Sequence, residues 1–318
     1  MSSSQVVVTL QQFCETDAAP RELLRRAGCQ IRENSLGRRM TPEDLREWLA
    51  EADAVIAGAE PYDAELLGRL PRLRCISRCG TGTEAIDLDA ARRVGIEVLT
   101  TPEVVVEPVA QLTLAMILSL ARNLPFHASE FRTGRWTKRA GHLVSEWRIG
   151  LIGYGRIGRA VARLLQPFGP ALYVSDPRLD AAQLPPSAVA CPLPELLAQS
   201  DLVSLHVSRR PEEGALLGRR ELLQMKRGSF LVNTSRGFLV DEPALYERLA
   251  EGHLAGAALD VFADEPYRGP LTQLPQVLCT PHVGSLTIAS RAAMEVECAR
   301  NLVQWLARRA APAAQGRG

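Results

Sequence analysis

The feature that most constrains the fold of this chain is a repeated alternation of short apolar runs with helical stretches. In the first third of the chain the apolar runs lie at 6–10, 53–58, 74–80 and 96–100. The helical stretches between them lie at 20–28, at 41–52 and around 63–70 and 88–94. Strands that alternate with helices form βαβ units, whose strands lie parallel in one sheet.

The same alternation restarts after a long apolar stretch at 106–124. Its β-type runs are, in chain order, WRIGLIGYG, ALYVSD, DLVSLHV, SFLVNTS, AGAALDVF and QVLCTPH. A chain of 318 residues has room for two such units. The sequence therefore predicts an α/β protein with two doubly wound parallel-sheet domains, and we expect the long helix to bridge them.

The second series opens with GYGRIG, residues 153–158, between a predicted strand and a predicted helix. Gly153 permits a tight turn, Gly155 lets a pyrophosphate approach the backbone, and Gly158 allows helix and strand to pack closely. The helix that follows offers N–H groups and a positive dipole end to phosphates. Asp176 ends the next strand, where an acid accepts hydrogen bonds from the adenosine ribose. This order of elements predicts dinucleotide binding, with NAD preferred to NADP.

Three charged residues follow three strands of the same half: Arg236 in NTSRG, Glu265 in LDVFADEP and His282 in CTPHVGS. The carboxyl ends of parallel strands line the ligand crevice. Hydride transfer to a carbonyl requires a proton donor, an arginine fork binds a carboxylate, and a carboxylate supports an imidazolium. Each residue alone could be structural, but together they predict reduction of a 2-oxo acid. No metal site is expected, because no second histidine stands at ligand spacing.

These motifs resemble the D-isomer-specific 2-hydroxyacid dehydrogenases. The resemblance is carried by GYGRIG, MKRGSFLVNTSRG, AGAALDVFADEP and CTPHVGS, and it extends from about residue 75 to 290. It implies a flavodoxin-like substrate domain formed by 1–101 and 287–318, with a Rossmann NAD-binding domain, 102–286, inserted between them. It also implies that Arg236 holds the substrate, that Glu265 orients His282, and that His282 is the general acid in reduction and the base in oxidation.

The resemblance also implies which residues contact the cofactor. They are Gly153, Gly155, Arg156, Ile157, Gly158, Asp176, His206, Val207, Thr234, Ser235, Arg236, Asp260, His282 and Ser285. His206 has a second interpretation, in which its backbone lines the cofactor pocket while its ring only packs.

The substrate is less constrained than the reaction. The stretch 77–102 resembles the phosphoglycerate dehydrogenases of this family, which implies substrate binding by Arg78, Cys79, Gly80, Thr81, Lys138 and Arg236. The loop 78–82 would offer backbone N–H groups to a carboxylate, and Arg78 would meet a second anionic group. Against a phosphate, Gly58 stands where some relatives have arginine, and Glu60 would repel it. A 3-phosphoglycerate-like substrate, a phosphonate or dicarboxylate analogue, and a plain hydroxy acid all stay open.

Composition limits the classes of binding partner and the compartment that we expect for this protein. The net charge is +1, which gives no support for nucleic acid or an acidic membrane. No apolar run reaches the ~20 residues of a membrane span, and the N-terminus lacks a basic signal-peptide region. The seven cysteines form no C-x-x-C pair, which fits a reducing cytoplasm.

Two predictions concern assembly and class. The apolar circumference of 106–124, together with the family resemblance, predicts a homodimer, although burial of this helix between two domains of one chain would explain the same pattern. An NAD-sensing, corepressor-like binding protein is the alternative to an enzyme. Turnover of NADH with 2-oxo acids distinguishes these two classes.

Overall fold

A computed structural model describes residues 3–180, 182, 184–208 and 213–310 of the chain. The fold divides into two compact units, Met1–Val105 with Leu286–Gly318 (unit 1) and Val106–Ser285 (unit 2). The last part of the predicted substrate domain, 311–318, lies outside the described residues.

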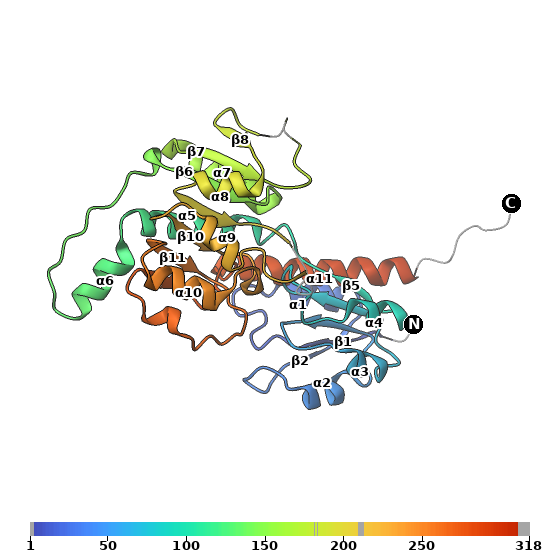
Figure 1. The fold of residues 1–318 in the computed structure, drawn as a ribbon. Helices are drawn as coiled ribbons and strands as arrows, with labels where there is room; N and C mark the ends of the chain where they lie inside the picture. The colour runs from blue at the N-terminus through green and yellow to red at the C-terminus, as the bar shows by residue number, and fades with distance from the viewer. Residues whose placement is uncertain (1–2, 181, 183, 209–212, 311–318) are drawn as a thin grey trace. The chain divides into compact units, whose positions relative to one another are not determined.

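Unit 1 is built on a five-stranded parallel sheet with strand order β2-β1-β3-β4-β5 (Figure 1). The strands are β1 (Gln5–Val8), β2 (Gln30–Glu33), β3 (Ala54–Ala57), β4 (Cys75–Arg78) and β5 (Glu97–Leu99). The helices are α1 (Ala19–Arg26), α2 (Pro42–Leu49), α3 (Ala64–Gly68), α4 (Leu88–Arg93) and α11 (Ile288–Ala310). Strand β3 is buried along its whole length, so the core of the unit lies on both faces of the sheet centre.

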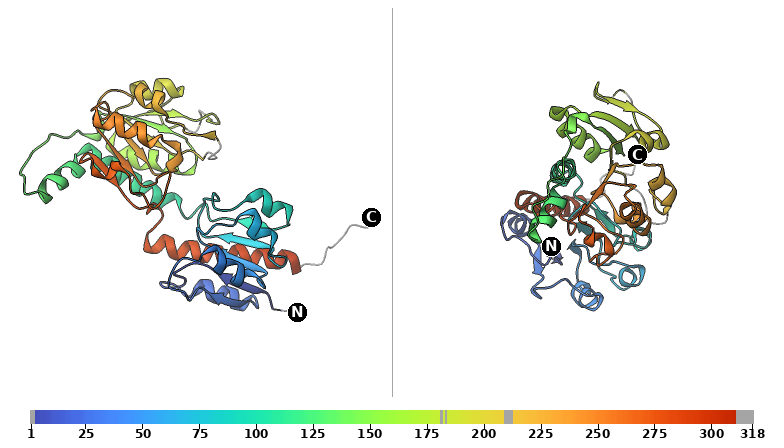
Figure 2. Two further views of the ribbon diagram at one scale, coloured as in Figure 1. Left: turned by 60° about the horizontal axis from the view of Figure 1, so that its bottom comes forward. Right: turned by 60° about the vertical axis from the view of Figure 1, so that its left-hand side comes forward.

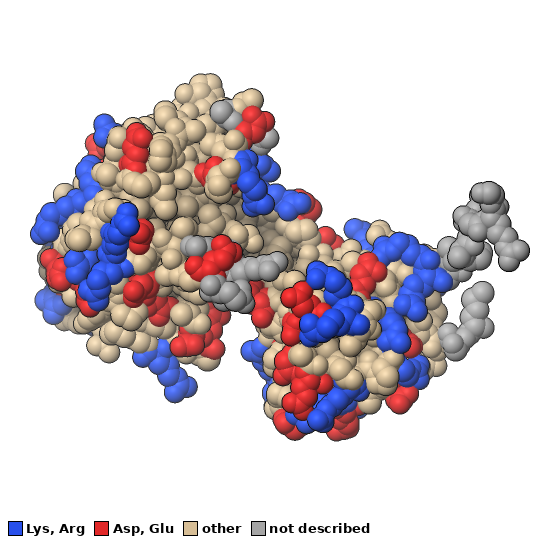
Figure 3. Space-filling model, turned by 45° about the vertical axis from the view of Figure 1, so that its right-hand side comes forward, with Lys and Arg blue, Asp and Glu red and all other residues tan. Residues whose placement is uncertain are grey.

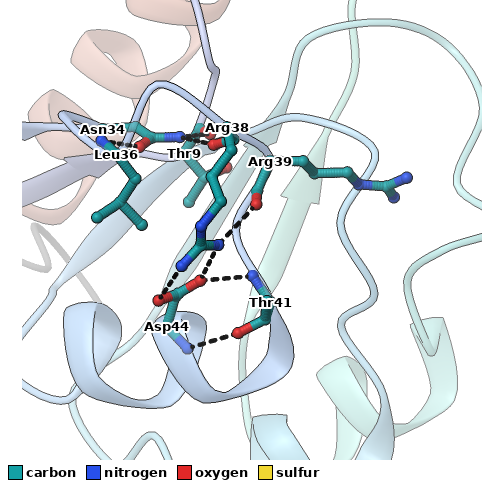
Figure 4. Close-up of polar contacts among 7 residues, drawn as sticks. All are labelled: Thr9, Asn34, Leu36, Arg38, Arg39, Thr41 and Asp44. Atoms are coloured by element: carbon teal, nitrogen blue, oxygen red, sulfur yellow. Dashed lines mark hydrogen bonds and ion pairs between the residues drawn. The ribbon is translucent and has the colours of Figure 1, made fainter.

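Three helices of unit 1, α2, α3 and α4, begin at a residue whose side chain caps the helix. At α2 the Thr41 hydroxyl accepts a hydrogen bond from the Asp44 N–H, and the Asp44 carboxylate accepts one from the Thr41 N–H (Figure 4). Such a reciprocal pair satisfies two backbone donors that have no partner within the helix. Asp63 and Asp87 cap α3 and α4 in the same way with one hydrogen bond each.

The last helix of the chain belongs to unit 1. Helix α11 packs against α1 and β4, and Figure 2 shows it running beside the blue N-terminal elements. The Ser77 hydroxyl on β4 donates to the carbonyl of Cys298 on α11 at 3.0 Å. Segments from the two ends of the chain therefore share one core.

Unit 2 contains a seven-stranded parallel sheet with strand order β12-β11-β10-β9-β6-β7-β8. The strands are β6 (Arg148–Ile152), β7 (Ala171–Ser175), β8 (Ala188–Ala190), β9 (Leu202–Leu205), β10 (Phe230–Asn233), β11 (Gly256–Leu259) and β12 (Val277–Cys279). The helices are α5 (Val106–Ala121), α6 (Leu124–Arg132), α7 (Arg156–Leu165), α8 (Leu193–Gln199), α9 (Arg219–Gln224) and α10 (Glu242–Ala250). The chain order reverses at β6, between β7 and β9, and ligands bind at such a switch point in open α/β sheets. The predicted fold class is confirmed.

Two strands were not predicted from the sequence, and each lies at the edge of its sheet. The segment QIRE of β2 alternates exposed and half-buried residues, and AVA of β8 is half-buried or exposed throughout. Edge strands have one neighbour and little buried surface, so they lack the apolar run by which a central strand is found.

The sequence predicts one long helix over 106–124, and this prediction is wrong at the C-terminal end of the helix. Helix α5 stops at Ala121, and Asn123 takes a left-handed conformation with φ of 51° before α6 begins. A left-handed residue cannot continue a right-handed helix. The two helices are bent by 67°, and α6 projects from the rest of unit 2 (Figure 2, left).

Helix α5 packs against α7, β10 and β11 within its own unit. Its buried side chains include Met116, Ile117 and Leu120. Within the described part of the chain no single helix is long and apolar enough to cross a membrane, and only the bent pair α5 and α6 meets that test by length and composition. On the face drawn in Figure 3, basic and acidic side chains are interspersed.

Candidate active site

The glycine-rich turn after β6 has the geometry that its sequence predicts. Gly153 has φ of 94°, and a Cβ there would lie 2.5 Å from the carbonyl oxygen of His206. A Cβ at Gly158 would lie 2.3 Å from the carbonyl oxygen of Gly153. Both positions therefore exclude any side chain.

Gly155 differs from these two glycines. A Cβ at Gly155 would meet nothing within 4 Å, so no contact with the described residues requires glycine there. Gly155 is the N-cap of α7, whose first-turn N–H groups have no acceptor within the helix. Open space beside a helix N-terminus fits the pyrophosphate of a dinucleotide. When NAD is bound, it supplies the hydride acceptor or donor.

Asp176 follows β7 and is fixed by the neighbouring backbone. The Tyr154 N–H donates to its Oδ2 and the Arg178 N–H donates to its Oδ1, both at 2.8 Å. The carboxylate is thus tied to the glycine-rich turn itself. Each carboxylate oxygen can accept a second hydrogen bond, so Asp176 keeps the capacity to bind ribose hydroxyls.

His206 follows β9, and its backbone carbonyl lies close to Gly153 of the glycine-rich turn. Its Nε2 lies 2.9 Å from the Ser204 hydroxyl, whereas its Nδ1 is buried and has no hydrogen-bond partner among the residues that the structure describes. Burial lowers the pKa of His206 from 6.5 to about 4. The ring is therefore neutral near pH 7, and it packs while the backbone of His206 limits the turn.

The loop after β10 is shaped by Asn233, a residue that the sequence analysis did not single out. Its side-chain amide donates to the carbonyl of Arg236 at 2.8 Å, and its Oδ1 accepts from the Ser235 N–H at 3.0 Å. The Ser235 hydroxyl donates to the carbonyl of Val207 at 2.7 Å. These bonds fix the backbone that carries Arg236 and connect it to the segment after β9.

A close backbone contact joins the loops that follow β10 and β11. A Cβ at Gly237 would lie 1.8 Å from the backbone carbon of Phe262, so only glycine allows this approach. Arg236 and Glu265 stand on the two chain segments that meet there. The Arg236 guanidinium donates to the Ser235 carbonyl at 2.7 Å and is half-buried.

Glu265 and His282 are hydrogen-bonded to each other. The histidine Nδ1 lies 2.8 Å from Oε2 of Glu265, and Oε1 accepts from the Phe262 N–H at 3.1 Å. A carboxylate only accepts at neutral pH, so Nδ1 carries the proton of this bond. The His282 side chain is 52 % exposed, which leaves Nε2 as the nitrogen that can exchange a proton with a substrate.

The turn that carries His282 is organised by Asp260, which is 1 % exposed. Its Oδ1 accepts from the Thr280 hydroxyl at 2.6 Å and the Val283 N–H at 2.8 Å, and its Oδ2 accepts from the Gly284 N–H at 2.8 Å. His282 has φ of 54°, an uncommon conformation for a residue with a side chain. Buried hydrogen bonds of this kind hold the residue there against its backbone preference.

The structure corrects the predicted carboxylate-binding loop of unit 1. The Cys79 N–H donates to the Ala57 carbonyl at 2.9 Å, and the Gly80 N–H donates to the Thr101 hydroxyl at 2.9 Å. The first bond continues the pairing of β4 with β3 beyond Arg78, and the second ties the loop to the residue two positions after β5. Thr81 is exposed and Gly82 is half-buried, so the predicted loop can still offer the N–H groups of these two residues.

Other predicted positions lie apart from the Glu265–His282 pair. Lys138 is exposed in the segment after α6. A cavity of about 450 Å³ lies at the amino-terminal edge of the seven-stranded sheet, where its lining includes Phe126, Arg139, Phe230 and Gln276. This edge is opposite to the strand ends that Arg236, Glu265 and His282 follow, so the cavity is not at the predicted reaction site. Among the described residues no group of acids, histidines and cysteines could hold a metal ion.

Comparison with known proteins agrees with this geometry. Residues 114–284 match the family model "D-isomer specific 2-hydroxyacid dehydrogenase, NAD binding domain". The chain is 39% identical over 278 residues to a glyoxylate reductase of Thermococcus gammatolerans, covering 84% of this chain and 83% of that protein. It is 36% identical over 244 residues to a D-3-phosphoglycerate dehydrogenase of Mycobacterium tuberculosis, covering 74% of this chain and 46% of that protein.

Among solved structures, D-lactate dehydrogenase from Aquifex aeolicus, complexed with NAD and lactic acid, has a TM-score of 0.82 and 25% identity, and the match covers 96% of each chain. The fold and the glycine turn define an NAD-dependent oxidoreductase. The chain belongs to the D-isomer specific 2-hydroxyacid dehydrogenase family. The predicted family, enzyme class and cofactor are thereby confirmed, and an enzyme is favoured over an NAD-sensing binding protein.

Proposed function

We propose that this enzyme interconverts a short 2-oxo acid and the corresponding D-2-hydroxy acid. The observation that carries the proposal is the 2.8 Å hydrogen bond between Glu265 and His282, which leaves Nε2 reachable. In reduction His282 donates a proton from Nε2 to the carbonyl oxygen, and in oxidation the same nitrogen takes it back. Glu265 holds the ring and stabilises the imidazolium before proton transfer.

Arg236 supplies the second element of the site. Its planar guanidinium can bind a carboxylate through two N–H groups, and it stays charged at every working pH. The neighbouring hydrogen bonds of Asn233 and Ser235 fix the backbone on which it stands. Arg236 therefore orients the 2-oxo acid and polarises its carbonyl.

The direct test is oxidation of NADH with a panel of 2-oxo acids that includes glyoxylate, hydroxypyruvate, phosphonopyruvate and phosphohydroxypyruvate. We expect turnover of glyoxylate and hydroxypyruvate. His282→Ala should lower kcat by roughly 10²–10⁴ while NADH affinity changes little, because general acid catalysis has that effect. The exposed His142 provides a matched control, since His142→Gln should keep kcat. Wild-type kcat in His282→Ala, or no turnover of any 2-oxo acid, would contradict the proposal.

A 3-phosphorylated 2-oxo acid is the second candidate, and Arg78 is the observation that favours it. Arg78 ends β4 with its guanidinium beside Gly80, where a second anionic group is expected by resemblance. The same panel distinguishes the two candidates. A kcat/KM for phosphohydroxypyruvate above that for hydroxypyruvate would favour the phosphorylated substrate.

We also propose that the enzyme is a homodimer. Helix α6 and the segment after it expose large apolar side chains, with Phe131 66% and Trp136 77% accessible and their rings 5.3 Å apart. Leu124 and Leu143, also exposed, stand at the two ends of this segment. Exposed apolar groups gathered in one projecting segment are typical of an interface. Light scattering at micromolar protein should give the mass of a dimer, and Trp136→Asp should shift it toward the monomer. A monomeric wild-type protein would refute this proposal.

A further inference from the structure

Two buried cysteines meet where α11 packs against β4 in unit 1. The Ser77 hydroxyl donates to the Cys298 carbonyl at 3.0 Å, which fixes the position of α11 on the sheet. Cys79 follows two residues later, and its N–H continues the pairing with β3, so its side chain points to the same face as that of Ser77. The Cys79 and Cys298 thiols are hydrogen-bonded to each other. The fold therefore brings two thiols from distant parts of the chain into contact.

This contact distinguishes the pair from the remaining cysteines. All seven cysteines belong to the described residues and carry free thiols. In that part of the chain no hydrogen bond to a second thiol is formed by the other five, which are Cys14, Cys29, Cys75, Cys191 and Cys279. A disulfide requires sulfur atoms about 2 Å apart, so two thiols already in contact need the least movement to form one.

The two thiols of the pair differ in acidity. The hydrogen bond that Cys298 donates lowers the pKa of the Cys79 thiol. The positive charges of Arg291 and Arg78 act in the same direction, whereas burial and the Glu295 carboxylate oppose it. Burial raises the pKa of the Cys298 thiol well above its usual range. The thiolate is the reactive form of cysteine, so Cys79 is the nucleophile and Cys298 is its protonated neighbour.

Cys79 is also the more accessible of the two thiols. It is 8% exposed, whereas Cys298 is 0% exposed. Such limited exposure favours a small oxidant over a bulky one. Hydrogen peroxide is small, and it oxidises thiolates to sulfenic acids that condense with a neighbouring thiol.

We propose that Cys79 and Cys298 form a redox modification site that hydrogen peroxide converts into a disulfide. The Cys79 thiolate attacks one peroxide oxygen, the O–O bond breaks, and the hydroxide that leaves takes up the proton lost by Cys79. The Cys298 sulfur then attacks the Cys79 sulfur of the sulfenic acid, the S–O bond breaks, and the departing hydroxide takes the Cys298 proton. Two thiols are thereby oxidised while one peroxide is reduced to two water molecules. The new bond joins α11 to the loop 78–82 of unit 1.

The test treats the folded full-length protein with hydrogen peroxide and follows its mass over time. We expect a loss of about 2 Da, the mass of two hydrogen atoms, which dithiothreitol reverses. A digest without reductant should contain a peptide pair linked through Cys79 and Cys298, and iodoacetamide should find the other five thiols free. An unchanged mass, a linkage through another cysteine, or oxidation without a linkage would overturn the inference.

Variants separate the roles of the two thiols. In Cys298→Ser the sulfenic acid of Cys79 has no thiol to condense with, so dimedone should label Cys79 and the mass loss should disappear. In Cys79→Ser the buried Cys298 should stay a thiol. Cys191→Ser is the matched control, because Cys191 is a half-buried free thiol of unit 2, and it should form the disulfide as the wild type does. The wild-type mass loss in Cys298→Ser or in Cys79→Ser would contradict the pairing.

Oxidation of the urea-unfolded wild type shows whether the fold selects the pair. In the unfolded chain the seven thiols have no fixed neighbours, so several different linkages should form. Equal yields of the Cys79–Cys298 peptide pair from folded and unfolded protein would show that the contact between α11 and β4 does not direct the reaction. This comparison needs no variant, so it decides the matter even where Cys79→Ser or Cys298→Ser fails to fold.

Discussion

Acidification should destabilise this protein through His206, and the size of the effect follows from the structure. The pKa of His206 falls from 6.5 to about 4 on folding because the ring is buried. An imidazolium has two N–H donors, yet Nδ1 of His206 is buried without an acceptor in the described part of the chain. Protonation is therefore favoured in the unfolded chain and resisted in the folded one.

Above pH 6.5 the ring is neutral in both states and contributes nothing to the pH dependence. Between pH 6.5 and about 4 the unfolded state binds the extra proton, so the free energy of unfolding falls as the pH falls. Each pKa unit corresponds to about 1.4 kcal/mol, which gives at most about 3 kcal/mol over the whole window. Part of this loss, about 2 kcal/mol, should have occurred by pH 5.

The assay is urea unfolding, followed by circular dichroism, at pH 7.5 and pH 5.0. The wild type and His206→Gln should differ in their pH dependence by about 2 kcal/mol, since glutamine does not titrate. His142→Gln serves as the control, because His142 is exposed, and it should follow the wild type. Parallel pH profiles of the wild type and His206→Gln would show that His206 is not held neutral, and the reasoning from its burial would be wrong.

Three further predictions concern the cofactor and substrate sites. Gly153→Ala should lower stability and NADH affinity together, because its φ is 94° and the added Cβ meets the His206 carbonyl, whereas Gly155→Ala should weaken NADH binding and leave the thermal midpoint unchanged. Equal effects on stability would contradict this contrast. NADH should be preferred to NADPH by at least ~10-fold in kcat/KM, about 1.4 kcal/mol, since the Asp176 carboxylate would face the 2′-phosphate. Parity of the two cofactors would show that Arg178 outweighs Asp176. Arg236→Lys should raise KM and lower kcat at unchanged NADH affinity, because an ammonium cannot form the planar fork; unchanged kinetics would remove Arg236 from the site.

The sequence by itself determined the parts of this protein that depend on local pattern. Central strands such as β3 and β9 are short apolar runs, which is the pattern of a strand buried on both faces. Thr41 and Asp44 mark the start of α2, because they form its capping box. The glycines at 153 and 158 are required by backbone approach within one short segment, so their spacing already predicts the turn. The fold class, the family and the dinucleotide site could be predicted for this reason.

Features that depend on contacts between distant segments of the chain became apparent only in the tertiary structure. It showed that Asp260 holds the turn of His282, that Gly237 admits the backbone of Phe262, and that the Cys79 and Gly80 N–H groups are already used. Burial is likewise absent from a sequence, so the lowered pKa of His206 was not visible there. The physical reason is that a buried polar group depends on which partners the fold brings to it, and those partners come from remote parts of the chain.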